Sequence, residues 1–297
     1  MATITTATNL FPSTLVAEMV DKVKGHSSLA KLSAQNPLPF AGQDIFTFTM
    51  DGEAGIVGEG AAKPAGDAVV AAKTIKPIKF VYQHRITDEF LNMSEERQIP
   101  YLATFTDGFA KKIARGLDIA AMHGFNPADG KASDIVGTNC FDSLVTNKVT
   151  YAAATVDENI DDAVGLIQAK DGNVTGIAFA NAAASALGKI KASGTGTYLY
   201  PEFRFGANPG AFGGMLADVN TTVSFGTSTD KAIVGDFANM FRWGYADSIP
   251  MEVILYGDPD GLGDLKRNNQ IVLRAEAYLG WAVLDADSFA IVAGAEG

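Results

Sequence analysis

The sequence is poor in cysteine and in positive charge. Cys140 is the only cysteine among 297 residues, which excludes an internal disulfide and a zinc site built from cysteines. The chain carries 34 acidic and 23 basic side chains, so general nucleic-acid binding is disfavoured, because phosphate contacts need clustered Lys and Arg. The single cysteine favours a reducing compartment such as a cytoplasm. The acidic charge balance remains compatible with a protein that lies near nucleic acid without adhering to it.

The N-terminus, MATITTATNLFPSTLVAEMV, lacks the basic start and long apolar core of a signal peptide. No transmembrane run and no heptad repeat is present in the sequence. What is there is ordinary globular chemistry, with 47% hydrophobic residues, 19% charged residues and 31 glycines. The chain is long enough for one large domain or two smaller ones, with many turns.

The stretch 97–124 predicts a long amphipathic helix. Asp107 precedes Lys111 by four residues, the favourable order for a helical ion pair. Pro100 suits a first helical turn, where its missing N–H costs nothing, and Gly124 is a stop signal. The predicted apolar face consists of Leu102, Phe105, Phe109, Ile113, Leu117 and Ala121, and the charged positions on a different face are Asp107, Lys111, Arg115 and Asp118.

Two strand-like segments, 43–50 and 72–87, flank a long Gly- and Ala-rich stretch and predict an oversized hairpin. Loops beyond about a dozen residues are unusual unless they bind something or are disordered. The returning strand carries a local basic edge, for which a solvated strand face is favoured over a partner site. Its residues are Lys73, Lys76, Lys79, His84 and Arg85. Before the hairpin, 1–10 predicts a mobile arm and 12–23 a short helix that docks onto another body, such as a neighbouring subunit.

The second half of the chain predicts a separate α/β unit followed by two strands. A helix at 156–170, a buried strand at 174–179 and an Ala-rich helix at 181–191 give the β-α order of that unit. The stretch 193–215 is a glycine- and aromatic-rich loop. Strict alternation over 271–283 predicts a strand with one core face, and a second strand follows at 285–292. We expect these last strands to carry the apolar face of the long helix.

Two glycine-containing loops resemble ligand sites only in part. Asp258, Asp260 and Asp264 match the first half of a calcium loop, but the acid needed at its end is replaced by Asn269, so an Asp/Gly turn is favoured. The glycines around Lys63 lack the Gly-Lys-Ser/Thr order and the strand–helix setting of a phosphate loop.

The remaining chemistry-bearing residues give no site pattern. His26, His84 and His123 are far apart in the sequence, and no Gly-x-Ser-x-Gly motif accompanies them. Cys140 is interpreted as a buried structural thiol. The aspartates at 157, 161 and 162 complement the dipole of a helix start before they suggest a catalytic pair. We therefore predict no catalytic, cofactor-binding or metal-binding residues, no cofactor, and a protein that is not an enzyme.

The order of these parts resembles that of the major capsid proteins of tailed bacteriophages with the HK97-type fold. The matching segments span nearly the whole chain and follow one another in the same order. They are the hairpin with VGEGAAKPAGD at its tip, KPIKFVYQHRITDEFLNMS, IARGLDIAAMHGFNPADG, and ILYGDPDGLGDLKRNNQIVLRAEAYLGWAVLDADSFAIV with its Arg-x-Glu strand.

The resemblance implies an α+β fold with an N-terminal arm, an extended β-hairpin loop, a peripheral domain whose long spine helix lies on a sheet, and an α/β axial domain. It assigns 193–215 as a candidate loop at the capsomer axis. The implied ranges are 1–35 for the arm, 36–90 for the extended loop and flanking strands, 91–154 for the peripheral domain, 155–250 for the axial domain and 251–297 for the return strands completing the peripheral domain.

The function implied by the resemblance is self-assembly into the icosahedral head shell around a double-stranded DNA genome, in hexamers and pentamers. The expected location is the virion, after assembly in the host cytoplasm. Expected partners are other copies of the chain, a portal, decoration proteins and a separate scaffolding protein. Many of the family begin with a long scaffolding segment, for which there is no room ahead of Phe11, so either a separate protein supplies scaffolding or the sequence is already the mature form. Some relatives form Lys–Asn cross-links, but no motif selects a pair among Lys63, Lys73, Asn268 and Asn269, so no cross-link is predicted.

Two alternatives stay open at this point. An encapsulin-type nanocompartment shell shares the fold but holds protein cargo, and tail-bearing, DNA-filled heads in electron micrographs would distinguish the phage protein from it. A soluble α/β enzyme with an unrecognised site belongs to another class. It would be favoured by a subunit that stays monomeric at every concentration and salt.

Overall fold

The computed structural model describes residues 26–51, 54–93, 95–246 and 251–294. The arm predicted at 1–10 and the helix predicted at 12–23 lie outside the described residues. The α-helices are α2 (Ser28–Leu32), α3 (Glu95–His123), α4 (Phe141–Leu144), α5 (Val156–Gln168), α6 (Asn181–Leu187) and α7 (Phe237–Met240). The strands are β1 (Gln43–Asp51), β2 (Asp67–Ile75), β3 (Ile78–Thr87), β4 (Lys148–Thr150), β5 (Gly176–Phe179), β6 (Ala211–Phe212), β7 (Met215–Val219), β8 (Asp230–Gly235), β9 (Phe241–Tyr245), β10 (Met251–Ile254), β11 (Gln270–Val283) and β12 (Phe289–Ala293).

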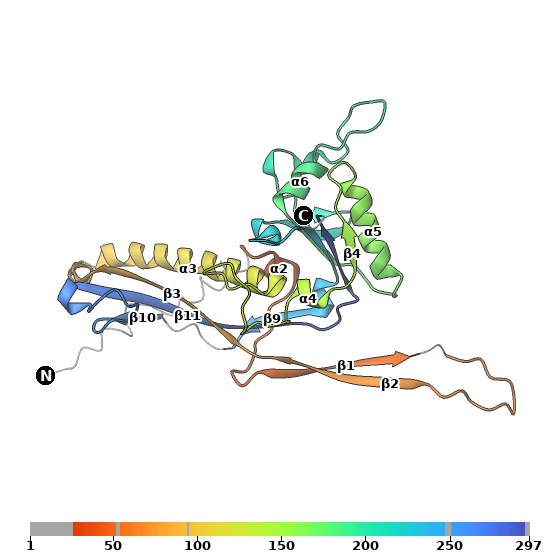
Figure 1. Ribbon diagram of the computed structural model, residues 1–297, viewed down its shortest axis with the longest axis horizontal. Helices are drawn as coiled ribbons and strands as arrows, with labels where there is room; N and C mark the ends of the chain where they lie inside the picture. Colours follow the sequence, from red (N-terminus) through yellow and green to blue (C-terminus); the bar gives the residue numbers. More distant parts are fainter. Residues whose placement is uncertain (1–25, 52–53, 94, 247–250, 295–297) are drawn as a thin grey trace.

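The described strands form two main sheets and one separate ribbon (Figure 1). One sheet has the order β10-β11-β3, with β9 also paired to β11, and α3 lies along it. The other has the order β4-β12-β8-β5-β7-β6 and is accompanied by α5 and α6. The ribbon β1-β2 projects away from both. The α+β class predicted from the sequence is therefore confirmed.

The long helix is confirmed, although α3 begins at Glu95, two residues before the predicted start. Pro100 consequently lies inside the helix and not in its first turn. All six residues of the predicted apolar face are buried, and they share one core with β11. Gly124 follows the helix with φ +71°, and its N–H donates to the carbonyl oxygen of Ala120 (3.0 Å), so the predicted glycine stop is correct.

The prediction is wrong for Asp118. The spacing predicts a charged face for this residue, but its side chain is fully buried. The other charged positions agree better: Lys111 is exposed and its Nζ lies 2.8 Å from Oδ2 of Asp107. Hydrophobic periodicity counts every carboxylate as a solvent-facing residue. Asp118 departs from that rule because donors from other segments satisfy it, as described below.

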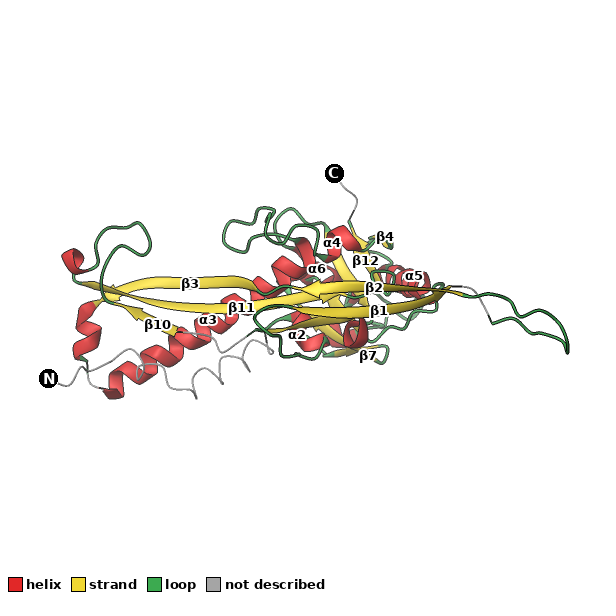
Figure 2. Cartoon of the chain, turned by 90° about the horizontal axis from the view of Figure 1, so that it is seen from below, coloured by secondary structure: helices red, strands yellow, loops and turns green. Residues whose placement is uncertain are grey.

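The hairpin is confirmed, but the segment predicted as one strand at 72–87 is two strands. β1 and β2 pair antiparallel from Gln43 opposite Ile75 to Asp51 opposite Asp67. After Lys76-Pro77 the chain continues as β3, which pairs with β11 and not with β1. Proline has no N–H to donate to a ladder, which explains a change of partner at this point. Figure 2 shows β3 and β11 side by side along much of the molecule.

The alternation predicted over 271–283 is confirmed, since every second residue from Ile271 to Val283 is buried. The C-terminal half of β11 is buried on its other face as well, where Gly280 approaches Leu38 and Ile75. The expectation for the following strand is wrong. β12 pairs with β8 and β4 in the second sheet, so β11 but not β12 lies in the sheet beneath α3.

Residues 35–38 run along β9 and explain its glycine. The N–H groups of Asn36 and Leu38 donate to the carbonyl oxygens of Trp243 and Tyr245 (2.9 and 3.0 Å). A Cβ on Gly244 would lie 1.6 Å from the carbonyl oxygen of Asn36. Only glycine permits this close approach of two backbones.

The second sheet carries the predicted α/β unit. The helix predicted at 156–170 is α5, and the buried strand at 174–179 is β5, whose four residues are all buried. The Ala-rich helix ends at Leu187, earlier than the predicted 191, and a Cβ on the next residue, Gly188, would lie 2.9 Å from the backbone of Phe203. The predicted loop at 193–215 contains a short 3-10 helix, η2 (Pro201–Gly206), and the strand β6.

Candidate functional site

The ribbon β1-β2 presents an apolar face to solvent. Phe46, Phe48 and Met50 alternate along β1 and are 71%, 62% and 74% exposed. Phe48 lies opposite Val70 of β2, which is 61% exposed. Residues directly opposite each other in an antiparallel pair share one face, so these side chains form one continuous apolar strip.

Such a strip is unusual on an isolated two-stranded ribbon. A hairpin alone is marginally stable in water, and contiguous exposed apolar surface marks an interaction site. The tip loop, 54–66, adds the exposed side chains of Ile56 and Val57. Figure 1 shows the ribbon standing clear of the two sheets, and Figure 2 shows the tip extending beyond the rest of the subunit. The arrangement suits contact with another molecule.

The basic edge predicted on the returning strand is partly neutralised within the subunit. Nζ of Lys79 lies 2.8 Å from Oε1 of Glu276, and Nε2 of His84 lies 2.9 Å from the hydroxyl of Tyr101. Lys73 and Lys76 are exposed. These contacts favour a strand face satisfied by its own fold.

The acidic loop considered as half of a calcium site holds an arginine. The guanidinium of Arg85 donates from Nε to Oδ2 of Asp260 (2.8 Å) and from Nη2 to Oδ1 of Asp258 (3.1 Å) and to the carbonyl oxygen of Gly263 (2.7 Å). The Arg85 hydrogen bond holds the pKa of Asp260 at about 2, well below its usual value. A side-chain cation thus occupies the loop, which agrees with the turn interpretation.

Asp118 fixes the first described helix to the long helix. Its carboxylate accepts hydrogen bonds from the N–H groups of Ser28 (2.9 Å) and Leu29 (3.2 Å) and from the hydroxyl groups of Ser27 and Thr222. Burial raises the pKa of Asp118 to about 6, although these donors favour the charged form. The start of α2 is therefore capped by a carboxylate from α3.

The opposite side of α2 contacts the second sheet. The hydroxyl of Ser28 donates to Oδ2 of Asp218 in β7 (2.6 Å), and Nζ of Lys31 lies 2.8 Å from Oδ1 of the same residue. α2 is therefore held between the two parts of the subunit by two buried carboxylates.

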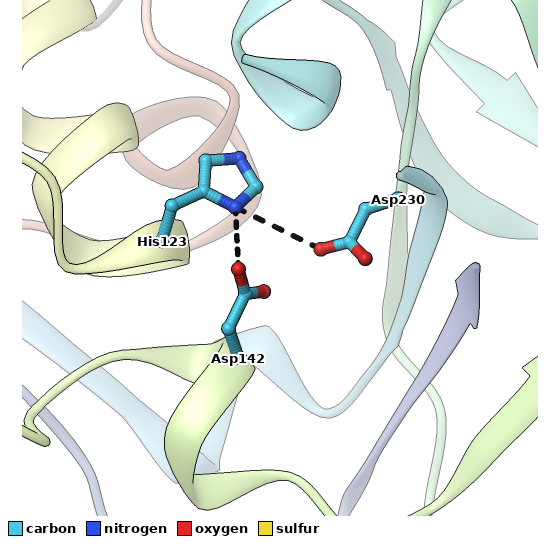
Figure 3. Close-up of side chains that lie close together, drawn as sticks. All are labelled: His123, Asp142 and Asp230. Atoms are coloured by element: carbon cyan, nitrogen blue, oxygen red, sulfur yellow. Dashed lines mark hydrogen bonds and ion pairs between the residues drawn. The ribbon is translucent and has the colours of Figure 1, made fainter. Parts of the chain in front are cut away.

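A second polar cluster lies where α3, α4 and β8 meet (Figure 3). Nδ1 of His123 lies 2.8 Å from Oδ2 of Asp142 and 3.7 Å from Oδ2 of Asp230. The other ring nitrogen, Nε2, lies 2.9 Å from the carbonyl oxygen of Thr222. One histidine thus faces two carboxylates at the end of the long helix.

Burial and the neighbouring groups shift the pKa of each residue in the cluster. Burial opposes a charged His123, but the hydrogen bond and charge of Asp142 outweigh it and raise the pKa of the imidazole. Burial also opposes a charged Asp142, yet hydrogen bonds from His123 and Asp230 lower its pKa. Burial and the neighbouring Asp142 raise the pKa of Asp230 to about 7.

The sequence did not predict either cluster. It named His123 without partners, because Asp142 and Asp230 lie 19 and 107 positions further along the chain. His26 is exposed and His84 lies elsewhere, so the histidines are not gathered. Cys140 is buried with Sγ 3.2 Å from the hydroxyl of Ser143, as interpreted. The only sequence signals for the two clusters were a charged residue inside a predicted helix, Asp118, and a histidine at the end of that helix, His123.

Other candidates stay apart or serve the fold. The hydroxyl of Tyr200 donates to Oδ2 of Asp157 (3.3 Å), while Asp161 and Asp162 are exposed on α5. The loop with Lys63 is the tip of the ribbon and precedes a strand, not a helix. The segment with Asn268 and Asn269 lies at the opposite end of the molecule from that tip (Figure 1).

None of the helices in the described part of the chain combines the length and apolar character needed to cross a bilayer.

Comparison with known proteins identifies the class. Residues 7–294 match the model of the phage capsid family. A solved structure from Mycobacterium phage Ogopogo is 35% identical, with a TM-score of 0.79, 91% of this chain covered and 92% of the other. One from Gordonia phage Cozz is 26% identical, with a TM-score of 0.75 and coverage of 92% and 87%. The capsid of an empty GTA particle shares the fold at 17% identity, with a TM-score of 0.65 and coverage of 91% and 90%. No curated protein matches this chain.

The chain belongs to the phage capsid family, and its fold is the HK97-type capsid fold. It is a capsid shell protein, a structural component of the virion. The encapsulin and enzyme alternatives receive no support from these comparisons.

Proposed function

We propose that this major capsid protein assembles into hexamers and pentamers through the ribbon β1-β2. Each ribbon packs the strip of Phe46, Phe48, Met50 and Val70 against an adjacent subunit. The observation that carries the proposal is the exposure of this strip on a ribbon that projects from its own subunit. Head-to-tail contacts of this kind close into rings when the rotation is right, and obligate interfaces exceed about 2,000 Å².

The domain division follows from the same proposal. We assign 1–35 to the arm, 36–90 to the extended loop and its flanking strands, 91–154 to the peripheral domain and 155–250 to the axial domain. The return segment, 251–297, completes the peripheral domain with β10 and β11. Several strands cross this division, since β3 and β9 pair with β11, and β4 and β12 lie in the second sheet.

We also propose a structural and not an enzymatic role. The hollow between α3 and β3 is lined mainly by apolar side chains, among them Phe80, Ile113 and Val136. Its lining within the described residues contains no carboxylate and no histidine. A shell subunit needs only surfaces that bind other copies of itself.

The remaining partners are proposed from charge and from the family. A net charge of -11 suits a shell that encloses DNA without sequence-specific binding and leaves it free to eject. A separate scaffolding protein, a portal and decoration proteins complete the head, which assembles in the host cytoplasm. Mapping the electrostatic potential of the inner surface tests the charge argument, and a continuous basic lining would contradict it.

Neighbouring residues of β2 give a matched pair of variants for the assembly proposal. Val70 lies on the apolar strip, whereas Ala71 is exposed on the opposite face of the ribbon. Val70→Glu places an unpaired carboxylate in the proposed interface, which costs several kcal/mol. Since each 1.4 kcal/mol is a factor of about ten, the yield of shells should fall at least about tenfold.

Particles are counted by sedimentation and electron microscopy, and circular dichroism checks that each subunit folds. Ala71→Glu introduces the same charge one residue away and should retain most of the yield. Normal shells from folded Val70→Glu subunits would contradict the proposed role of the strip. Micrographs of heads from infected cells, DNA-filled and bearing tails, test the wider assignment.

A further inference from the structure

The cluster of His123, Asp142 and Asp230 has features that the shell function does not require. Three elements contribute one ligand each: the last residue of α3, a residue of α4 and the first residue of β8 (Figure 3). One ligand atom from each residue lies within 4.8 Å of the others. The three side chains converge on one point from segments distant in the sequence.

The tautomer of His123 follows from its second nitrogen. A carbonyl oxygen can only accept, so Nε2–H donates to the carbonyl oxygen of Thr222 (2.9 Å). Nδ1 then faces Asp142 and Asp230. A lone pair directed at two carboxylates is repelled by them, so a positive species has to lie between the three groups. Histidines that bind metals commonly donate their other N–H to a backbone carbonyl in this way.

Two oxygen atoms of the cluster lack a hydrogen-bond partner. When both carboxylates are charged, Oδ1 of Asp142 and Oδ2 of Asp230 are buried and make no hydrogen bond within the described residues. Asp230 is only 6% exposed. A buried, unsatisfied carboxylate oxygen costs free energy unless a proton or a metal ion satisfies it.

We propose that Nδ1 of His123 and the carboxylates of Asp142 and Asp230 bind a divalent transition-metal ion of the Zn²⁺ class. A tetrahedral Zn²⁺ with bonds of about 2.0–2.1 Å separates its ligand atoms by about 3.3 Å. The separations of Nδ1 from the two carboxylates, 2.8 and 3.7 Å, bracket that value. One nitrogen and two carboxylate oxygens suit Zn²⁺ better than Ca²⁺ or Mg²⁺, which prefer oxygen ligands alone.

Protons and a metal ion would balance the charge in different ways. A proton on Nδ1 balances Asp142 and leaves Asp230, whose pKa is raised, to take up a second proton, whereas one divalent ion balances both carboxylates without added protons. Lys148 is the nearby cation that acts on Asp142, but its side chain is exposed. A surface hollow bordered by Asp142, Lys148, Thr229 and Asp230 brings solvent to two of the three proposed ligands.

A bound ion would join the two parts of the subunit. α3 belongs to the core shared with β11, and β8 is a central strand of the second sheet. The metal would therefore clamp the end of the long helix onto the second sheet through α4. Its loss should loosen this junction without removing either core.

The experiment uses full-length protein purified in assembled shells, without added metal and then with ZnCl₂. The bound metal is measured by mass spectrometry, and the thermal midpoint is recorded before and after treatment with EDTA. We expect about one Zn²⁺ per subunit, a lower midpoint after EDTA and recovery with ZnCl₂. Replacement by Co²⁺ should give the visible absorption of a four-coordinate ion.

Asp230→Asn keeps the shape of the side chain, removes one ligand and relieves the repulsion between the carboxylates. It should weaken Zn²⁺ binding at least about tenfold, as judged by titration. Asp162→Asn removes an exposed acid from α5 and should bind normally. Wild-type shells that hold no Zn²⁺ and show no zinc-dependent midpoint would refute the site, leaving a proton between the three groups. Undiminished binding by Asp230→Asn would refute the ligand assignment.

Discussion

Replacing Asp118 by alanine tests whether a buried carboxylate, and not apolar packing alone, fixes α2 to the long helix. The two oxygens of Asp118 accept from five donors, contributed by α2, by its N-cap residue and by 220–222. Alanine removes every acceptor and leaves buried N–H and O–H groups unpaired. The substitution therefore tests the contacts of one residue with two separate segments, 27–29 and 220–222.

The magnitude follows from those donors. Each buried donor left without an acceptor costs about 1–3 kcal/mol, but some will turn to water or to one another. We therefore expect Asp118→Ala to lower the free energy of unfolding by about 3–5 kcal/mol, in the range found when a buried charged network is broken. Asp118→Asn retains one acceptor oxygen and should cost less, about 2 kcal/mol.

The assay is urea unfolding of the unassembled subunit, followed by the fluorescence of the buried residues Trp243 and Trp281. Hydrogen exchange at 28–33 reports on α2 directly and should accelerate in the variant. Asp107→Ala is the control, because it removes a surface ion pair from the same helix and should cost no more than about 0.5 kcal/mol. Equal stability and equal exchange in Asp118→Ala and the wild type would refute the reasoning.

Three further predictions concern single contacts. Arg85→Gln should return the pKa of Asp260 from about 2 toward 3.8 in a ¹³C NMR titration, and an unchanged pKa would contradict the ion pair. In the wild type, this pair stabilises the fold above pH 3.8, and its contribution is lost as the pH falls through about 2. Tyr245→Phe removes a buried hydroxyl that has no partner among the described residues, so stability in urea should be equal or higher by up to about 1 kcal/mol; a clear loss would reveal a hydrogen bond of this hydroxyl. Gly244→Ala forces a Cβ onto the backbone of Asn36 and should destabilise by more than about 3 kcal/mol, whereas a neutral result would show that 35–38 moves freely.

Hydrophobic periodicity predicted the helix and the strand that each bury one face in the core. The three-to-four spacing from Leu102 to Ala121 and the alternation from Ile271 to Val283 each record one buried face, and both elements are correct. Such patterns survive in the sequence because every residue on that face is excluded from water. The order of the elements then indicated the family.

Strand pairing was decided by the tertiary structure. The strand after Asp285 and the segment 72–87 have local patterns that do not state a partner, and both predictions needed correction. A strand exposes the same backbone groups on both edges, so its neighbour depends on which other strand meets it. Only Pro77 left a local sign of the change.

The sequence by itself determined which residues leave water and therefore the helix, the strands and the class of fold. It did not determine which polar residues join them, because Asp118 and His123 look like surface charges until Ser28, Thr222 and Asp230 arrive from other segments. Local spacing in the sequence indicates which residues are buried, whereas only the folded chain determines which groups form hydrogen bonds.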